Sequence, residues 1–269
     1  MNERAMAVDN ILNCARSVLF AHAHPDDETL ASGGLIAELV ARGIHVTLLT
    51  ASRGERGEVV TGPLSHLAGT EALSVERERE LAGALRELGI PEHYWLGAAP
   101  ARADGKTERS YRDSGMIWVS EGVAGPADDA TTDALARADV AEVTSDVAAL
   151  LTATGPDLVI SYDDHGGYGH PDHVAIRDAA LRASVACGIP FAELLEEPAA
   201  DARWFDLEHR RGTMTDALRH HASQLTVFGT NVVHSGGQRE PIHPSVGLRL
   251  VDPGVLAGST DAHELLAER

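Results

Sequence analysis

SVLFAHAHPDDE, residues 17–28, is the stretch of sequence that decides the fold. Val18–Ala23 is a short apolar run that predicts a buried strand, and Glu28–Arg42, which Gly43 ends, has the pattern of a helix. The polar residues between them therefore lie where a strand passes into a helix. Because ligand sites in open α/β sheets gather outside the carboxyl ends of the strands, this cluster is the first candidate site.

The spacing within His24-Pro25-Asp26-Asp27-Glu28 suits metal-dependent hydrolysis. His24 and Asp27 are three residues apart and can converge on one divalent ion as the helix begins. Asp26 then points elsewhere and is left as a carboxylate that can take a proton from water beside the metal. The alternative is that the acids only cap the helix and favour its positive end, at about 0.3–1 kcal/mol each.

The composition is that of an acidic globular protein. Of 269 residues, 43% are hydrophobic and 23% are charged, and 22 basic against 41 acidic side chains give a net charge of −19. This charge argues against nucleic acid or an anionic membrane as a partner. We expect a single domain over residues 1–269, with its core at about 17–188 and residues 189–269 as its C-terminal part.

The cysteines and the N-terminus indicate a reducing, cytoplasmic setting. Cys14 and Cys187 lie far apart and form no CxxC pair, so a disulfide scaffold is not expected. No apolar stretch approaches the ~18 residues of a membrane span, and Glu3, Arg4 and Asp9 precede the first apolar run. The sequence predicts no particular oligomeric state.

Two further strands and a long irregular segment follow. His45–Ser52 predicts a second buried strand, which ends in Arg53–Glu58, either a plain solvated loop or part of the site. His93–Gly97 predicts a third strand, after which periodicity stops over Ala98–Asp133. Because connections longer than about 12–15 residues are often binding loops, we expect Tyr111–Met116 to form a mobile wall of the substrate pocket, a disordered insertion being the alternative.

Arg77 is a candidate for holding a polar substrate group. Ala72–Leu88 has leucines at helical spacing, and Arg77 lies one turn before them on the buried face. A crossover helix begins at the carboxyl edge of the sheet, which is where the site is expected. The alternative is a local salt bridge with Glu80 or Glu78.

A second polar cluster follows another strand. Leu135–Thr152 predicts a helix, Asp157–Tyr162 a strand, and Val174–Cys187 a helix with Pro171 in its first turn. Between this strand and helix lies DDHGGYGHPDH, residues 163–173. Two such clusters at equivalent strand ends are much harder to explain as helix caps than one.

Together the clusters complete a catalytic metal site. A catalytic zinc typically keeps three protein ligands, and His173 can supply the nitrogen that His24 and Asp27 lack. His170 is then left over beside Asp172, whose carboxylate can orient its ring. No G-x-S-x-G follows a strand and no G-x-G-x-x-G follows the first one, which disfavours a serine hydrolase and a dinucleotide-binding protein.

The remainder predicts shorter elements. The expected strands are Pro190–Leu195, Trp204–Leu207 and Ser245–Val251, and the expected helix is Thr213–Ser223. Gly229–Pro244 is expected to be a loop, whose His234 and His243 either line the pocket or lie on the surface. Alternating strands and helices predict an α/β, Rossmann-like, mostly parallel sheet with helices on both faces and the active site at the carboxyl ends of the strands.

The two clusters resemble the motifs of a known family. HPDDE at residues 24–28 with GGYGHPDH at residues 166–173 resembles the LmbE/PIG-L-like zinc-dependent deacetylases, which remove an acetyl group from N-acetylglucosamine units. The resemblance implies that Asp26 is the general base. The metal ligands that it implies are His24, Asp27 and His173. Such a set binds Zn²⁺ and also accepts Fe²⁺ or Co²⁺.

Other motifs resemble one branch of that family. GERGEV at residues 54–59, Arg77 with Glu80-Leu81, and RDSGM at residues 112–116 are similar to the actinobacterial enzymes that act on N-acetylglucosaminyl-inositol in mycothiol synthesis. The resemblance covers roughly residues 17–188. It implies a small N-acetylated amino sugar as the substrate.

The resemblance also implies roles around the reacting amide. Tyr168 and His170 polarise the carbonyl and stabilise the oxyanion, His170 also protonates the leaving amine, and Asp172 holds His170. The residues that it implies for sugar or inositol hydroxyls and for the shape of the pocket are Arg77, Asp113 and Glu58.

The sequence departs from the family at His165, where the family carries asparagine, and it is short for an inositol-sugar deacetylase. One alternative is a mycothiol S-conjugate amidase; that group has proline where this chain has Gly169, which favours deacetylation. A second alternative is a non-catalytic relative that binds metal or sugar. The presence of Asp26, His170 and Asp172 argues against it, because metal binding alone needs none of them.

Overall fold

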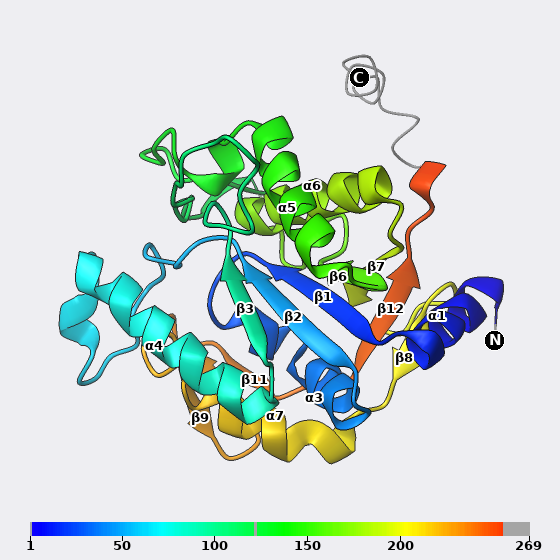
Figure 1. Ribbon diagram of the computed structural model, residues 1–269. Coiled ribbons are helices and arrows are strands. Elements are labelled where there is room, and N and C mark those ends of the chain that lie inside the picture. The colour runs from blue at the N-terminus through cyan, green and yellow to red at the C-terminus, as the bar shows by residue number, and fades with distance from the viewer. Residues whose placement is uncertain (1, 121–122, 255–269) are drawn as a thin grey trace.

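The computed structural model describes residues 2–120 and 123–254. The strands of its central sheet are β1 (Ser17–His22), β2 (His45–Thr50), β3 (Glu92–Trp95), β6 (Leu158–Ser161), β7 (Phe191–Leu195), β8 (Arg203–Phe205) and β12 (Val246–Leu250). Their order is β3-β2-β1-β6-β7-β12-β8 (Figure 1). From β3 to β7 the strands run parallel, and β12 runs antiparallel to β7 and β8. The expected mostly parallel sheet is confirmed.

Helices cover both faces of this sheet. They are α1 (Glu3–Cys14), α2 (Asp27–Leu30), α3 (Gly33–Ala41), α4 (Glu71–Leu88), α5 (Val140–Thr154), α6 (Pro171–Cys187) and α7 (Arg211–Leu218), with 3-10 turns at Ser65–Leu67, Leu135–Arg137 and Glu208–Arg210. Figure 1 shows α3, α4 and α7 on one face and α5 and α6 on the other. Along β1, Val18 and Phe20 pack in the core on the side of α3, α4 and α7, whereas Leu19 and Ala21 pack in the core on the side of α5 and α6. Burial on both faces explains why residues 18–21 of β1 are an unbroken apolar run.

The strand order creates a topological switch point between β1 and β6. From β1 the chain moves outward to β2 and β3, then returns to the other side of β1 to form β6 and β7. Open α/β sheets bind ligands in the crevice at such a point. Residues 24–28 follow β1 and residues 163–173 follow β6, so the fold brings both clusters to this crevice.

The single helix expected over Glu28–Arg42 is wrong, because the segment forms α2 and α3 with a break at Ser32. The Ser32 hydroxyl donates to the carbonyl of Glu28 at 2.9 Å. At Gly34 a Cβ atom would lie 2.1 Å from the carbonyl oxygen of Pro244, so the close approach of these two backbone segments requires glycine. These contacts override the helical pattern.

The expectation of an irregular segment over Ala98–Asp133 is wrong in part. The segment contains an antiparallel hairpin, β4 (Ile117–Ser120) with β5 (Val123–Gly125). Before the hairpin, Tyr111 is buried, and its hydroxyl donates to Asp146 of α5 at 2.8 Å. The wall that was expected to be mobile is therefore anchored to α5. The helix expected from Leu135 begins only with α5 itself.

The C-terminal part departs further from expectation. Gly229–Pro244, expected as a loop, contains β10 (Asn231–His234) and β11 (Arg239–Pro241), which form an antiparallel sheet with β9 (Leu225–Phe228). These strands are short, β10 is mostly half-buried and β11 is exposed, so no apolar alternation marks them in the sequence. The helix expected over Thr213–Ser223 is α7, which begins and ends earlier. The assignment of the whole chain to one domain stays a prediction.

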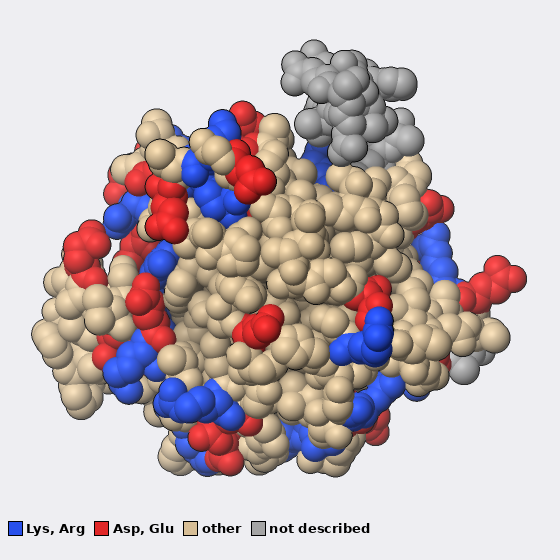
Figure 2. Space-filling model, viewed as in Figure 1, with Lys and Arg blue, Asp and Glu red and all other residues tan. Residues whose placement is uncertain are grey.

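Charges of both signs are intermingled on the face drawn in Figure 2. On the face in Figure 2, Lys and Arg side chains lie among Asp and Glu side chains, and the drawn part of this face offers no continuous basic surface to a polyanion. Within the described residues, no helix is long and apolar enough to cross a membrane. Cys14 and Cys187 are both exposed and free.

Candidate active site

The chain turns sharply after β1, and the turn is strained. Asp26 has φ 107° and ψ −32°, a conformation that residues other than glycine rarely adopt. Strain of this kind costs about 1–3 kcal/mol and clusters at functional sites. Asp26 N–H donates to Glu28 Oε2 at 3.0 Å, and Arg77 Nη2 donates to Asp26 Oδ2 at 3.0 Å. Asp26 and Asp27 thereby have separate partners, as their spacing predicted.

Asp27 lies between two imidazoles. Its Oδ2 is 3.3 Å from His24 Nδ1, and its Oδ1 is 3.2 Å from His173 Nε2. Ligand atoms around one tetrahedral zinc ion lie about 3.4 Å apart. His173 Nδ1 is 3.1 Å from the carbonyl oxygen of Gly166, which assigns the ring hydrogen to Nδ1 and leaves Nε2 as a bare lone pair. This buried Nε2 has no hydrogen-bond partner among the described residues. The three side chains of His24, Asp27 and His173 therefore fit a divalent cation.

A carboxylate holds His24 from its other side. His24 Nε2 is 3.2 Å from Asp172 Oδ2, and Asp172 also accepts the backbone N–H groups of Ser114 at 2.9 Å and Ala136 at 3.1 Å. The Asp172 carboxylate thereby assigns the His24 hydrogen to Nε2 and leaves Nδ1 free for a metal. The first turn of α6 directs the Asp172 carboxylate toward Ser114 and His24, and its expected role in holding His170 stays a prediction.

His170 caps the N-terminus of α6. Its Nδ1 accepts the backbone N–H of Asp172 at 3.2 Å, so Nε2 carries the ring hydrogen. Burial, followed by the neighbouring His24 and His173, lowers the pKa of His170 to about 3. His24, His170 and His173 can bring ligand atoms within 4.8 Å of one another. A nitrogen that carries hydrogen is not a ligand, however, so Asp27 is the better third member and His170 is a neutral donor.

Two tyrosines flank His173. Tyr162 follows β6 and stacks on the His173 ring, with centroids 4.1 Å apart and planes 6° apart, and its hydroxyl accepts the N–H of Ala23 at 2.9 Å. Only its place at the end of a strand, before the second cluster, could have marked Tyr162 in the sequence. Tyr168, expected to polarise the amide carbonyl, is 58% exposed, and its ring centroid lies 5.1 Å from that of His173. Tyr168 therefore stands at the rim of the site.

Arg77 supports the strained turn. It is buried, and its guanidinium donates to the carbonyl oxygens of Gly54 and Pro25 as well as to Asp26. It pairs with neither of the acids on its own helix that were considered as alternatives. Since these contacts occupy the end of the guanidinium, Arg77 holds the Asp26 carboxylate, and its binding of substrate hydroxyls stays a prediction that the contacts do not favour.

Asp113 and Glu58 occupy different surroundings. Asp113 is buried, its Oδ2 accepts the N–H of Arg56 at 3.1 Å, and its Oδ1 lies 3.7 Å from His24 Nε2. It therefore lies within the site, beside an expected metal ligand. Glu58 is exposed and accepts the hydroxyl of Ser235 at 3.1 Å, which places it between the loop after β2 and the C-terminal sheet.

The three histidines whose roles the sequence left open lie outside the cluster. The side chain of His165 is 83% exposed. His243 is exposed as well, and His234 is 2.7 Å from Glu240 on the neighbouring strand. Their contacts favour surface roles.

Buried charge makes this a site for a cation. Burial, the largest effect, and the neighbouring Asp27 raise the pKa of Asp26 to about 6, and Arg77 opposes the rise. Burial works against a charge on His24, but the surrounding carboxylates, Asp113 first, raise its pKa well above the usual value. Carboxylates that hold a proton on a buried histidine attract a metal ion by the same field. Asp26 titrates near neutrality, which suits a general base.

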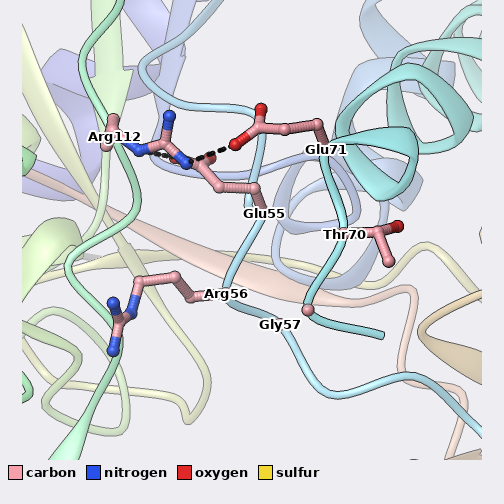
Figure 3. Close-up of a pocket in the computed structure, with 7 residues that line it drawn as sticks. Glu55, Arg56, Gly57, Thr70, Glu71 and Arg112 are labelled. Carbon is pink, nitrogen blue, oxygen red and sulfur yellow. Dashed lines mark hydrogen bonds and ion pairs between the residues drawn. The ribbon is translucent and has the colours of Figure 1, made fainter. Parts of the chain in front are cut away.

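A polar pocket opens next to Asp113. It has a volume of about 350 Å³ and is lined by Glu55, Arg56, Gly57, Gly69, Thr70, Glu71 and Arg112 (Figure 3). Arg112 lies 3.1 Å from Glu55 and 3.3 Å from Glu71. The backbone N–H of Asp113 donates to Glu55 at 3.3 Å, so the pocket and the buried cluster share this wall.

The fold and the buried histidines and carboxylates define an α/β protein with a candidate metal centre at its switch point. The family model described as PIG-L, GlcNAc-PI de-N-acetylase, matches residues 19–184. The chain belongs to this family. The expected resemblance is thereby confirmed.

Two similar curated proteins carry the name 1D-myo-inositol 2-acetamido-2-deoxy-alpha-D-glucopyranoside deacetylase. The protein from Kineococcus radiotolerans is 44% identical over 174 residues, which are 65% of this chain and 46% of that protein. The protein from Kribbella flavida is 40% identical over 181 residues, which are 66% of this chain and 57% of that protein. The chain thus spans about half the length of the curated relatives it matches.

Solved structures share the fold at low identity. N,N'-diacetylchitobiose deacetylase from Pyrococcus horikoshii superposes with a TM-score of 0.60 at 20% identity, over 98% of each chain. The 4-carboxy-2-hydroxymuconate hydratase from Pseudomonas putida gives 0.51 at 16% identity, over 88% of this chain and 97% of that one. Because a hydratase shares the fold, the likeness shows the fold alone, and function has to be argued from the site.

Proposed function

We propose that the chain is a zinc-dependent hydrolase that removes the acetyl group from an N-acetylglucosamine-type sugar. The observation that carries this proposal is the buried Asp27 between His24 Nδ1 and His173 Nε2, with the Asp26 carboxylate beside it. The names of the curated relatives support N-acetylglucosaminyl-inositol as the substrate.

The proposed roles of the residues follow from their contacts. His24, Asp27 and His173 would hold the ion. When bound, zinc supplies Lewis acidity toward water and the amide carbonyl. Asp26, whose pKa is about 6, accepts the proton of the attacking water. His170 donates its Nε2 hydrogen to the carbonyl oxygen as negative charge grows there, and Tyr168 adds its hydroxyl from the rim.

The leaving amine also needs a proton. His170 was expected to supply it, but its Nδ1 accepts the backbone N–H of Asp172, which makes the neutral ring a hydrogen-bond donor through Nε2. Asp26 holds the proton that it took from water, and it lies at the same site. We therefore assign the return of this proton to Asp26.

The polar pocket beside Asp113 supports a substrate that is larger than an isolated amino sugar. The Arg112 guanidinium is paired with the Glu55 and Glu71 carboxylates of the lining, so this part of the pocket suits hydroxyl groups better than a charged ligand. A polyol attached to the amino sugar is a ligand of this kind. The preference for zinc over Fe²⁺ or Co²⁺, the single-domain division and the cytoplasmic location stay predictions.

The experiment measures free amine released from N-acetylglucosaminyl-inositol, from plain N-acetylglucosamine and from a mycothiol S-conjugate. Zinc-loaded protein is compared with protein treated with a chelator. We expect chelator-sensitive release that is fastest for the inositol conjugate. Release from the S-conjugate alone would move the assignment to an amidase, and zinc binding without any release would identify a non-catalytic relative.

A further inference from the structure

A buried pair of charged groups lies behind Asp26. His221 Nε2 is 2.9 Å from Glu28 Oε1, and both side chains are fully buried. Thr29 Oγ1 also donates to Glu28 and lies 3.4 Å from His221 Nε2. The other ring nitrogen, Nδ1, has no hydrogen-bond partner among the described residues. Among the described residues, the polar contacts of the His221 side chain therefore go to Glu28 and Thr29.

Glu28 carries this contact on to Asp26. While Oε1 faces His221, Oε2 accepts the backbone N–H of Asp26 at 3.0 Å. That amide belongs to the residue with φ 107°, a conformation that persists only when its surroundings determine it. Because the Asp26 side chain leaves the backbone at this point, fixing the amide also fixes the direction of its carboxylate.

The segment that carries His221 is itself held by two other parts of the fold. Ser223 follows α7 and donates its N–H and its hydroxyl to Glu80 of α4, both at 2.7 Å. Val60 N–H donates to the carbonyl of Ser223 at 2.8 Å. This segment lies outside residues 19–184, which match the family model. A rigidly held segment of the C-terminal part thus reaches the turn after β1.

The charges strengthen the contact. Burial works against a charge on either side chain, but Glu28 raises the pKa of His221 and His221 lowers the pKa of Glu28. Removing one partner of a buried ion pair leaves the other charge uncompensated, which is strongly destabilising. A neutral side chain that keeps an N–H donor at position 221 avoids part of this cost and preserves the geometry.

We propose that His221, acting through Glu28, is a positioning residue that directs the Asp26 carboxylate at the reacting water. The inference rests on the proposed function, in which Asp26 is the general base. His221 contacts Glu28 and Thr29 rather than a reacting atom, so its influence passes through the backbone of the turn.

The experiment compares three variants of the full zinc-loaded chain. His221→Gln keeps an N–H donor to Glu28, His221→Leu removes it, and His220→Leu is a matched control at the neighbouring histidine, which lies 3.4 Å from Glu87. We expect kcat to fall about 10²-fold in His221→Leu with KM and bound zinc unchanged, because a displacement of about 1 Å has this effect on a catalytic group. His221→Gln keeps most of the rate, and His220→Leu keeps all of it.

The backbone amide of Asp26 gives a second readout that does not depend on activity. In the wild-type chain it donates to a buried carboxylate, so its proton is expected downfield in the NMR spectrum and protected from exchange. We expect His221→Leu to lose both properties and His221→Gln to retain them. If His221→Leu does not fold, the double variant Glu28→Leu/His221→Leu removes both buried charges and is expected to show the same losses.

Two results separate the possible failures. A folded, zinc-loaded His221→Leu chain with the wild-type kcat and the wild-type Asp26 amide signal would overturn the inference. If the wild-type chain releases no amine from any N-acetylated sugar, the proposed function fails instead. The amide signal and its exchange rate then decide on their own whether His221 positions Asp26.

Discussion

The two polar clusters of the site are alike in composition, but the fold treats them differently. Asp27 and Glu28 after β1 are buried, whereas Asp164 and His165 after β6 are exposed. Apart from the buried Gly166, the second cluster enters the interior from His170 onward. Its exposed half is a glycine-rich turn that delivers the start of α6 to the site, and its acids are solvated. In the first cluster the acids must find partners within the protein.

This difference explains where the chemistry lies. A buried carboxylate that lacks water has its pKa and its direction set by its neighbours, as Arg77 and Glu28 do for Asp26. The Asp164 carboxylate, in contrast, is exposed to solvent. Residues of the same type in the two clusters should therefore respond very differently to substitution.

Asp26→Asn should have the largest effect. It removes the proton acceptor and keeps the size of the side chain, so we expect kcat to fall about 10²–10⁴-fold with zinc still bound. Asp164→Asn is the matched control in the exposed half of the second cluster and should leave kcat unchanged. Steady-state amine release and the zinc content of both variants test this. A near-wild-type rate in Asp26→Asn would contradict the assignment of the base.

His170→Ala should follow, with a fall of about 10²–10³-fold in kcat, because one donor to the developing oxyanion is lost. Its zinc content should equal that of the wild type, which metal analysis after gel filtration measures. Loss of zinc instead would make His170 a ligand and remove Asp27 from that role.

Ser114→Ala should weaken zinc rather than the chemical step. The Ser114 hydroxyl donates to Asp172, which holds His24, and the loss of such support typically weakens metal affinity about 10–100-fold. Titration against a competing chelator measures the affinity. Ser145→Ala, an exposed serine on α5, is the control, and equal affinities in the two variants would show that Asp172 needs no help from Ser114.

His165→Asn should have the smallest effect. It installs the residue expected from the family at a side chain that is 83% exposed. We expect stability within about 0.5 kcal/mol of the wild type and an unchanged kcat, measured by denaturant unfolding and amine release. A large change in either would show that the exposed half of the second cluster takes part in the site.

Local pattern was enough to locate the crevice. The apolar runs of β1 and β6, each followed by a polar cluster, predicted that His24, Asp27 and His173 meet, and the structure brings them together. This succeeded because the strand ends, which the pattern marks, determine where these residues lie in a parallel sheet.

Contacts between distant segments could not be predicted in the same way. The His221–Glu28 contact joins residues 193 positions apart, and the His24–Asp172 contact joins residues 148 apart. Spacing rules describe neighbours within a helical turn or along a strand, so they paired Asp172 with the nearby His170 and offered no role for Glu28 beyond the helix cap of the alternative reading. The place of Tyr162 in the site could not be predicted for the same reason, because its stacking on His173 leaves no local pattern in the sequence.

The central claim is that Asp27, His24 Nδ1 and His173 Nε2 hold one catalytic ion beside Asp26. Its most direct test is the rate of amine release from N-acetylglucosaminyl-inositol as zinc is added back to metal-free protein. The account predicts no activity without metal and a linear rise that ends at one ion per chain, with Asp26→Asn binding the same ion and remaining inactive. Full activity in metal-free protein, or Asp27→Ala protein that binds zinc as tightly as the wild type, would contradict it.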